Sequence, residues 1–165
     1  MSTNLNRSVG RGMKLLFVCT GNTCRSSMAE VMARQIAAEA ALIGYAFVSA
    51  GTWAAPGSPA SEHARRVVAE YGLDLESHRA RLLTREVIEE ADLILTMTAA
   101  HKEQVLQLFP AAEGKVFTLL RFGWGQAGDV ADPFGGDIDA YRQAAAQIRH
   151  VLTGVISRLS ENNKG

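Results

Sequence analysis

Four short apolar segments alternate with stretches of helical periodicity, and this alternation restricts the fold more than any other feature of the chain. The segments are Lys14–Val18, Tyr45–Ala50, Asp92–Met97 and Lys115–Leu119. Short apolar runs bounded by turn residues are typical of strands buried on both faces. Their alternation with helices predicts an α/β fold, a three-layer αβα sandwich around a four-stranded parallel sheet.

The sequence also marks where two of the helices begin. One is predicted to begin near Arg25, because apolar side chains recur at helical spacing over residues 28–36. Another is predicted to open at Ser58 and Pro59, a favourable N-cap followed by proline at the first helical position. Gly72 is predicted to close it.

The second half of the chain predicts two further helices and one long loop. The helices cover about residues 99–108 and 138–160, where apolar side chains again recur at helical spacing. Residues 123–137 contain five glycines and one proline, so they are predicted to form a loop. No repeat or linker divides the chain. We therefore expect a single domain over residues 13–165, after a disordered polar leader at residues 1–12.

The charge balance restricts the possible partners. The 17 Lys and Arg residues offset 17 Asp and Glu residues, so the formal net charge is zero. No domain-wide positive field would attract nucleic acid or acidic lipid headgroups. The apolar runs are also too short for a signal segment or a membrane span. We expect no nucleic-acid or membrane partner, and a monomer or weak dimer.

The cysteine pattern indicates a reactive thiol. The two cysteines, Cys19 and Cys24, lie five positions apart near the start of the chain. A secreted disulfide scaffold would carry more cysteines, spread along its length. The four histidines lie far apart without the spacing of zinc ligands, so no metal is expected. We therefore expect a reducing compartment, the cytoplasm.

A loop suited to binding phosphate lies between the first predicted strand and the first predicted helix. It runs through Cys19, Thr20, Gly21, Asn22, Thr23, Cys24, Arg25 and Ser26. A loop of this length can turn its amide groups inward around an anion, and the helix that follows adds positive dipole character. Arg25 can bind two phosphoryl oxygens with its planar guanidinium. These features are predicted to lower the pKa of Cys19, whose thiolate would be the nucleophile.

Six stretches of the chain match the pattern of one known family. They are residues 18–26, 28–30, 49–52, 78–81, 91–97 and 132–134. Through them the chain resembles the low-molecular-weight protein tyrosine phosphatases from Met13 onward. The resemblance implies the strand order 2-1-3-4 and a cysteine-dependent phosphatase that forms a phosphocysteine intermediate. It also implies phosphorylated protein substrates and no metal or organic cofactor.

The resemblance assigns the second catalytic role to Asp132, in an Asp-Pro-aromatic segment. Expelling an alkoxide, a phenoxide or an amine from phosphorus requires a proton as the bond breaks. Asp132 would supply that proton while Cys19 is phosphorylated, and would then take one from the water that hydrolyses phosphocysteine. Pro133 would stiffen the segment, and Phe134 would line the cleft. Trp53 would flank the cleft mouth or else cover an edge of the core.

By the same resemblance, four residues are expected to support the loop. Ser26 would donate a hydrogen bond to the Cys19 sulfur, which stabilises the thiolate. Asn22 would hold the loop in a left-handed conformation through its hydrogen bonds. His78 would bridge toward Asn22 and Ser49.

The sequence leaves two alternatives for Cys24 and predicts no role in the site for three of the histidines. Cys24 is either a small packing residue or a resolving thiol that traps oxidised Cys19 as a disulfide. His63, His101 and His150 fall on predicted helices, and we expect them on the solvated surface.

The predicted substrate depends mainly on the identity of residue 23, which is Thr23. Tyrosine phosphatases of this family commonly have a bulkier aliphatic residue here. Threonine, together with residues 97–102 and 129–139, resembles the protein-arginine phosphatase branch. That resemblance implies a polar contact to a guanidino leaving group and favours phosphoarginine. The alternative is a tyrosine phosphatase in which Thr23 is only a smaller loop residue.

Other classes fit the sequence less well. An arsenate reductase with a similar loop would need two further cysteines to relay oxidation, and the chain has only Cys24 besides Cys19. A phosphate-carrying domain of a sugar-transport relay would have no need of Asp132 opposite the thiol. A non-catalytic module that binds phosphorylated residues would not need the complete set of Cys19, Arg25, Ser26 and Asp132.

Overall fold

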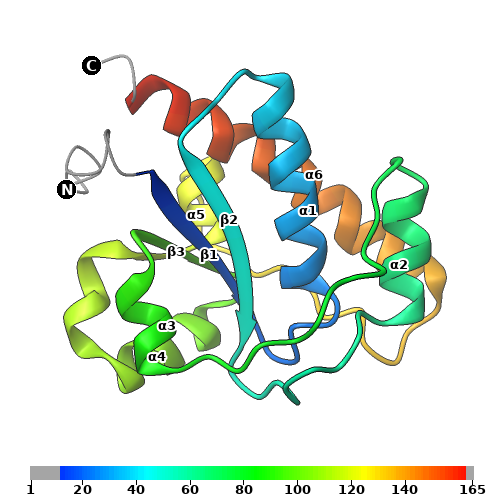
Figure 1. Cartoon of the computed structure of the whole chain (residues 1–165), viewed down its shortest axis with the longest axis horizontal. Coiled ribbons are helices and arrows are strands. Elements are labelled where there is room, and N and C mark those ends of the chain that lie inside the picture. The colour runs from blue at the N-terminus through cyan, green and yellow to red at the C-terminus, as the bar shows by residue number, and fades with distance from the viewer. Residues whose placement is uncertain (1–11, 163–165) are drawn as a thin grey trace.

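The computed structural model describes residues 12–162, and a parallel sheet forms its middle layer (Figure 1). The strands are β1 (Met13–Cys19), β2 (Tyr45–Gly51), β3 (Leu93–Thr96) and β4 (Val116–Thr118). All neighbouring strands are parallel, in the order β2-β1-β3-β4. The predicted fold class and strand order are confirmed. The predicted disordered leader lies outside the described residues, apart from its last residue.

The side chains of β1 enter both layers of the core. This strand pairs with β2 on one side and with β3 on the other. Leu15 and Phe17 belong to one buried cluster, and Leu16 and Val18 belong to a second. Successive side chains of a strand point to opposite faces, so a strand covered on both faces must be apolar at every position. This explains the unbroken apolar run that marks β1 in the sequence.

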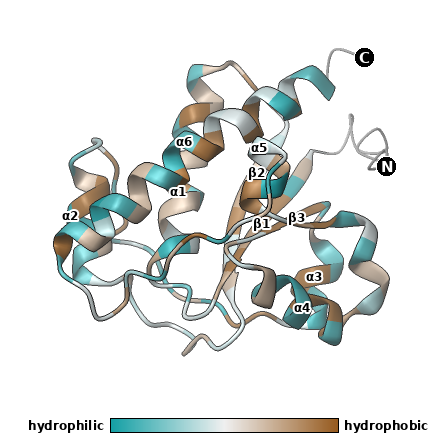
Figure 2. Ribbon diagram, turned by 180° about the vertical axis from the view of Figure 1, so that it is seen from behind, coloured by the Kyte–Doolittle hydropathy of each residue, from teal (hydrophilic) through white to brown (hydrophobic). Residues whose placement is uncertain are grey.

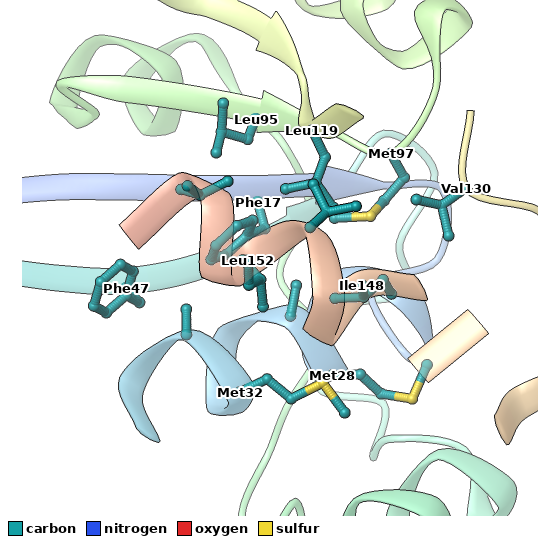
Figure 3. Packing of buried hydrophobic residues seen from close by; sticks show 14 of the residues in the cluster. Phe17, Met28, Met32, Phe47, Leu95, Met97, Leu119, Val130, Ile148 and Leu152 are labelled. Atoms are coloured by element: carbon teal, nitrogen blue, oxygen red, sulfur yellow. The ribbon is translucent and has the colours of Figure 1, made fainter. Parts of the chain in front are cut away.

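Two long helices cover the face of the sheet toward which Phe17 points. They are α1 (Arg25–Glu39) and α6 (Ile138–Asn162), which pack against each other. Figure 3 shows Met28 of α1 and Ile148 of α6 among the buried side chains of this layer. Only residues 20–24 separate the end of β1 from the start of α1, so this packing fixes the two ends of the loop between them.

Shorter elements complete both outer layers. The helices α2 (Glu62–Ala69) and α5 (Leu119–Trp124) lie on the same side of the sheet as α1. The opposite face is covered by α3 (Arg85–Glu90), α4 (Ala99–Leu108) and the 3-10 helix η2 (Pro110–Lys115). Figure 2 shows the strands mainly in the hydrophobic colours, while α6 has hydrophilic residues along its outer side. None of the helices within residues 12–162 has the length and apolar character needed to cross a membrane.

The predicted start of α2 is wrong by three residues. Ser61, not Ser58, is the N-cap, and its side chain accepts a hydrogen bond from the amide of Ala64 at 3.2 Å. Pro59 instead forms an isolated antiparallel bridge with Arg79. Pairing in an extended conformation prevents Ser58 and Pro59 from joining the helix, although their sequence suits a helix start.

The sequence did not predict the short elements α3, α5 and η2. Each has six residues, too few for a helical periodicity to become visible. A distant side chain also ends α3, because the Lys115 ammonium donates to the carbonyls of Ile88 and Ala91 at 2.8 and 2.6 Å. Such a cap from another part of the chain has no local sequence signal.

Helices α5 and α6 approach each other through a pair of glycines. A Cβ atom added at Gly154 would collide with the backbone carbonyl of Gly123. We predict that Gly154→Ala lowers the free energy of unfolding by about 1–3 kcal/mol, because neither backbone can move without disturbing the core. Urea denaturation of the variant measures this loss.

The matched control for this prediction is Gly114→Ala. An added Cβ at Gly114 has no atom within 4 Å, and its backbone does not have a positive φ. The control variant should therefore unfold at the urea concentration of the wild type or slightly above it. An equal loss of stability in the two variants would contradict close glycine packing.

Candidate active site

The loop from Cys19 to Arg25 connects the carboxyl end of β1 to the start of α1. Three backbone hydrogen bonds attach it to neighbouring segments: Thr52 N to Cys19 O, Trp53 N to Thr20 O, and Ser61 N to Thr23 O, at 2.9 to 3.0 Å. The side chain of Cys24, the N-cap of α1, accepts no hydrogen bond from the first amides of the helix. The free amides of a helix N-terminus are suited to binding an anion.

The loop rests directly on the backbone of β2. A Cβ atom at Gly51 would collide with the carbonyl of Thr20 and would lie 2.9 Å from the amide of Asn22. Only a residue without a side chain allows this approach. The position of the loop is therefore set by contact between two main chains.

Asn22 holds the loop in its curved conformation. It is fully buried and has a left-handed backbone with φ of 57°. Its side-chain amide donates to Ser26 Oγ at 2.8 Å, and its side-chain oxygen accepts from the amide of Arg81 at 2.9 Å. His78 Nε2 lies 2.6 Å from the Asn22 carbonyl oxygen, which is the contact predicted on that side.

The predicted bridge from His78 to Ser49 needs correction. The Ser49 hydroxyl donates to a carboxylate oxygen of Glu30 at 3.0 Å. Ser49 lies on β2 and Glu30 on α1, so this bond joins the sheet to the helix behind the loop. Ser49 thus supports the helix that follows the loop, not the histidine.

The Cys19 sulfur lies 2.8 Å from the Ser26 hydroxyl oxygen, and the residue is only 2 % exposed. Burial raises the pKa of the Cys19 thiol, because it removes the charged form from water. The Ser26 hydroxyl, its amide, the Arg25 charge and the amide of Asn22 all lower that pKa. The predicted lowering effects are present, but burial outweighs them, so the predicted net decrease of the pKa is not found.

Arg25 connects the loop to a segment more than a hundred residues away. Its guanidinium is buried and donates to the carbonyl of Val130 at 2.9 Å. A second nitrogen lies 3.5 Å from a carboxylate oxygen of Asp132. The Asp132 side chain is half exposed, and its other oxygen accepts from the amide of Phe134 at 3.0 Å. The structure thus brings the predicted acid beside the predicted phosphate-binding arginine.

The segment that carries Asp132 is also attached to the edge of β3 and α4. The Val130 amide donates to the carbonyl of Met97 at 2.8 Å. The Asp129 carboxylate accepts from the amide of Ala99, the first residue of α4, at 2.9 Å. These bonds fix the start of the segment, while Asp132 and residues 134–137 are exposed and Pro133 between them is buried.

These residues surround one cavity of about 280 Å³. Its lining consists of Cys19, Thr20, Gly21, Thr23, Cys24, Arg25, Trp53, Asp132 and Phe134. Trp53 and Phe134 are 84 % and 77 % exposed, so their rings border the cavity and also face the solvent. Every one of the lining residues was among the predicted site residues. Within residues 12–162, no cluster of three His, Cys, Asp or Glu side chains could hold a metal ion.

Cys24 lies among hydroxyl groups. Its sulfur is 3.5 Å from the Ser61 oxygen and 3.5 Å from the Tyr141 oxygen, and both cysteines are free thiols. Burial and the contact with Cys24 raise the pKa of Tyr141 to about 12. These contacts are consistent with a packing role for Cys24 and leave the proposed resolving role as a hypothesis.

The prediction of a solvated His101 is wrong. This residue is 4 % exposed, and its Nε2 lies 2.9 Å from the Thr20 hydroxyl oxygen. The sequence places it on α4 without revealing that the first turn of this helix points toward the loop. His63 is partly buried against the Tyr141 ring, whereas His150 is exposed as predicted.

Comparison with known proteins identifies the family. Residues 14–164 match the family model described as low molecular weight phosphotyrosine protein phosphatase. The chain belongs to this family. A protein-arginine-phosphatase of Geobacillus stearothermophilus is 45% identical over 90% of this chain and 94% of that protein. A second protein-arginine-phosphatase, from Bacillus subtilis, is 40% identical over 92% of this chain and its own full length.

A solved structure with the same fold is the YwlE arginine phosphatase, in a cysteine-to-serine mutant whose active-site serine is phosphorylated. It superimposes with a TM-score of 0.88 at 39% sequence identity. The match covers 92% of this chain and 99% of that chain. The predicted family is thus confirmed by sequence and by structure.

We predict that Ser26→Ala raises the pKa of Cys19. The hydroxyl lies 2.8 Å from the sulfur and stabilises the thiolate, so its loss favours the protonated form. Only the thiolate reacts with iodoacetamide. The midpoint of the alkylation rate against pH should therefore move to higher pH, as measured at Cys19 by fragmentation mass spectrometry.

Ser27→Ala is the control for this measurement. Ser27 is also buried in the first turn of α1, but its hydroxyl donates to the carbonyl of Cys24. Its removal should leave the midpoint unchanged. If both serine variants shift the midpoint equally, the sulfur contact of Ser26 is not the cause.

Proposed function

We propose that the chain is a protein-arginine phosphatase that acts through phosphocysteine at Cys19. The observation that carries this proposal is the convergence of the Cys19 sulfur, the Arg25 guanidinium and the Asp132 carboxylate on one cavity. A nucleophile, an anion-binding group and a proton donor are the three parts that phosphoryl transfer to a thiol requires.

In the first step, the loop amides and Arg25 bind the phosphoryl oxygens. The Cys19 thiolate attacks phosphorus, so that an S–P bond forms while the bond to the leaving nitrogen breaks. The electron pair of the broken bond stays on the guanidino nitrogen, which takes the proton of Asp132. Asp132 lines the cavity and is half exposed, so its carboxyl group can give a proton to a leaving group that departs toward the solvent.

In the second step, the Asp132 carboxylate takes a proton from a water molecule, and the water oxygen attacks phosphorus. The S–P bond breaks, and its electron pair returns to the Cys19 sulfur. Inorganic phosphate is released. The Ser26 hydroxyl stabilises this thiolate through the 2.8 Å contact. Because the buried thiol otherwise favours its protonated form, this contact matters most when sulfur is the leaving group.

Phosphoarginine is favoured over phosphotyrosine by the chemistry of the cavity. Thr23 contributes a hydroxyl to the lining where a bulky aliphatic side chain would exclude polar contacts. The rings of Trp53 and Phe134 could contact the faces of a planar guanidinium, and Asp132 would tolerate its charge. The two relatives described above are named protein-arginine-phosphatases, which supports the same substrate.

The proposal extends to the setting of the enzyme. Phosphorylated proteins would be the substrates, as the names of the relatives imply. The two free thiols favour a reducing compartment, and we propose the cytoplasm. We further propose that residues 13–165 act as a single domain.

We predict that Asp132→Asn lowers kcat by about 100- to 10,000-fold, the range of general acid catalysis. The accompanying loss in kcat/KM, which reports the step that expels the leaving group, should be larger for phenyl phosphate than for p-nitrophenyl phosphate, because the better leaving group needs less help from a proton donor. Cys19→Ser should abolish turnover of both substrates, as measured by phosphate release.

Asp139→Asn provides the control, since Asp139 is an exposed aspartate at the start of α6 that pairs with Arg142. It should retain the wild-type kcat. Equal losses in kcat/KM for the two aryl phosphates in Asp132→Asn would exclude a role as general acid, and full activity in Cys19→Ser would exclude phosphocysteine.

The substrate assignment predicts a preference that depends on Thr23. The wild type should have a higher kcat/KM for a phosphoarginine peptide than for the matched phosphotyrosine peptide. Thr23→Ile should reduce this ratio by at least about tenfold, the effect of one polar contact in a desolvated site. A wild type that prefers phosphotyrosine, with the ratio unchanged in Thr23→Ile, would identify a tyrosine phosphatase instead.

A further inference from the structure

His101 is the one buried histidine that faces the loop, and the mechanism above does not use it. It occupies the third position of α4, where its amide donates to the N-cap Thr98 at 3.1 Å. Its ring reaches the loop from the side opposite α1, and Nε2 lies 2.9 Å from Thr20 Oγ1. Thr20 in turn lines the cavity. The histidine thus contacts the proposed phosphoryl site indirectly, through Thr20.

The surroundings of the ring select one tautomer. Among residues 12–162, the Nδ1 atom of His101 has no hydrogen-bond partner, although it is buried. A buried N–H group without an acceptor is rarer and costlier than a nitrogen lone pair without a donor. The proton should therefore lie on Nε2, where the Thr20 hydroxyl oxygen can accept it.

Burial and a nearby positive charge keep the ring neutral. Burial and the Arg25 guanidinium lower the pKa of His101 to about 4, against smaller opposing effects of Asp132 and Asp129. At neutral pH the ring therefore carries a single proton. With that proton on Nε2, the interaction with Thr20 has a fixed direction, from the ring to the hydroxyl.

This direction determines what the Thr20 hydroxyl can do. Its oxygen accepts from His101, so its own hydrogen is free to donate elsewhere. Thr20 borders the cavity beside Cys19 and Arg25, where an anionic phosphoryl group would sit. Resting on the function proposed above, we propose that His101 is a positioning residue that orients the Thr20 hydroxyl as an additional hydrogen-bond donor to the phosphoryl oxygens.

The affinity for inorganic phosphate tests this directly and does not depend on turnover. Thr20→Val removes the donor but keeps the shape of the side chain, and its exposed position should leave the fold intact. We expect its Kd for phosphate, measured by isothermal titration calorimetry, to rise about tenfold, the loss of one hydrogen bond to a charged group. Thr20→Ser, which keeps the hydroxyl, should bind like the wild type.

Variants of His101 test the coupling between the two residues. His101→Leu should weaken phosphate binding as much as Thr20→Val does, and the double variant should be no weaker than Thr20→Val alone. His101→Gln should restore most of the affinity, because its amide nitrogen can donate from a position similar to Nε2. The controls are His150→Gln and Thr153→Val on the exposed side of α6, which should leave the Kd unchanged.

The tautomer is measured on the wild type, so this test remains decisive if His101→Leu does not fold. The ¹⁵N chemical shifts of the histidine rings should identify His101 at pH 7 as neutral with the proton on Nε2. Three results would each overturn the proposal. The first is a proton on Nδ1, and the second is a Thr20→Val variant that binds phosphate like the wild type. The third is a double variant whose increase in Kd is the product of the increases in the two single variants.

These outcomes are separate from those that test the substrate. A wild type that hydrolyses phosphotyrosine and not phosphoarginine, with the expected changes in phosphate affinity, would refute only the assigned substrate. A wild type that hydrolyses phosphoarginine, with an unchanged Kd in Thr20→Val, would refute only the role of His101.

Discussion

The hydrogen bonds of one buried asparagine determine the shape of the catalytic loop. Asn22 adopts a left-handed backbone conformation, which asparagine tolerates better than most residues other than glycine, and three hydrogen bonds hold it there. They connect the loop to Ser26 in the following helix, to the amide of Arg81 and to the ring of His78. The amide of Asn22 is also one of the groups that hydrogen-bond the Cys19 sulfur, so these bonds hold that donor in place. The proposed anion site therefore depends on contacts from residues outside the lining of the cavity.

Burial and a neighbouring positive charge act in opposite directions on the thiol at the centre of the site. It raises the pKa of the Cys19 thiol and so disfavours the nucleophilic form. The Arg25 guanidinium beside it donates to the Val130 carbonyl and lies 3.5 Å from the Asp132 carboxylate. The same arginine lowers the pKa of Cys19, and it adds to the effect of burial in lowering the pKa of His101. A single permanent charge thus influences the protonation of the groups around it, and the water-poor surroundings strengthen this influence.

The sequence predicted the elements that have a repeating pattern and failed where a contact comes from a distant segment. The strands, α1 and α4 were predicted closely because apolar periodicity is a local property. The start of α2 was misplaced because Pro59 pairs with Arg79 in an extended conformation. Asp132 was identified only through the resemblance to a family, since no spacing rule links it to Arg25. His101 was missed because its burial depends on how α4 lies against the loop, which no local pattern encodes.

The contact at Gly51 has a consequence for how substrate range can change within such a fold. The loop is held there by main-chain atoms, whereas Trp53 and Phe134 at the mouth are largely exposed. Residues at the mouth can therefore be exchanged without displacing the groups that bind phosphate. The family is described by phosphotyrosine, while two relatives of this chain are named for arginine. A scaffold that anchors its loop through main-chain atoms leaves side chains of the loop and of the mouth, such as Thr23 and Phe134, open to exchange, so that one phosphoryl chemistry can serve different amino-acid side chains over evolutionary time.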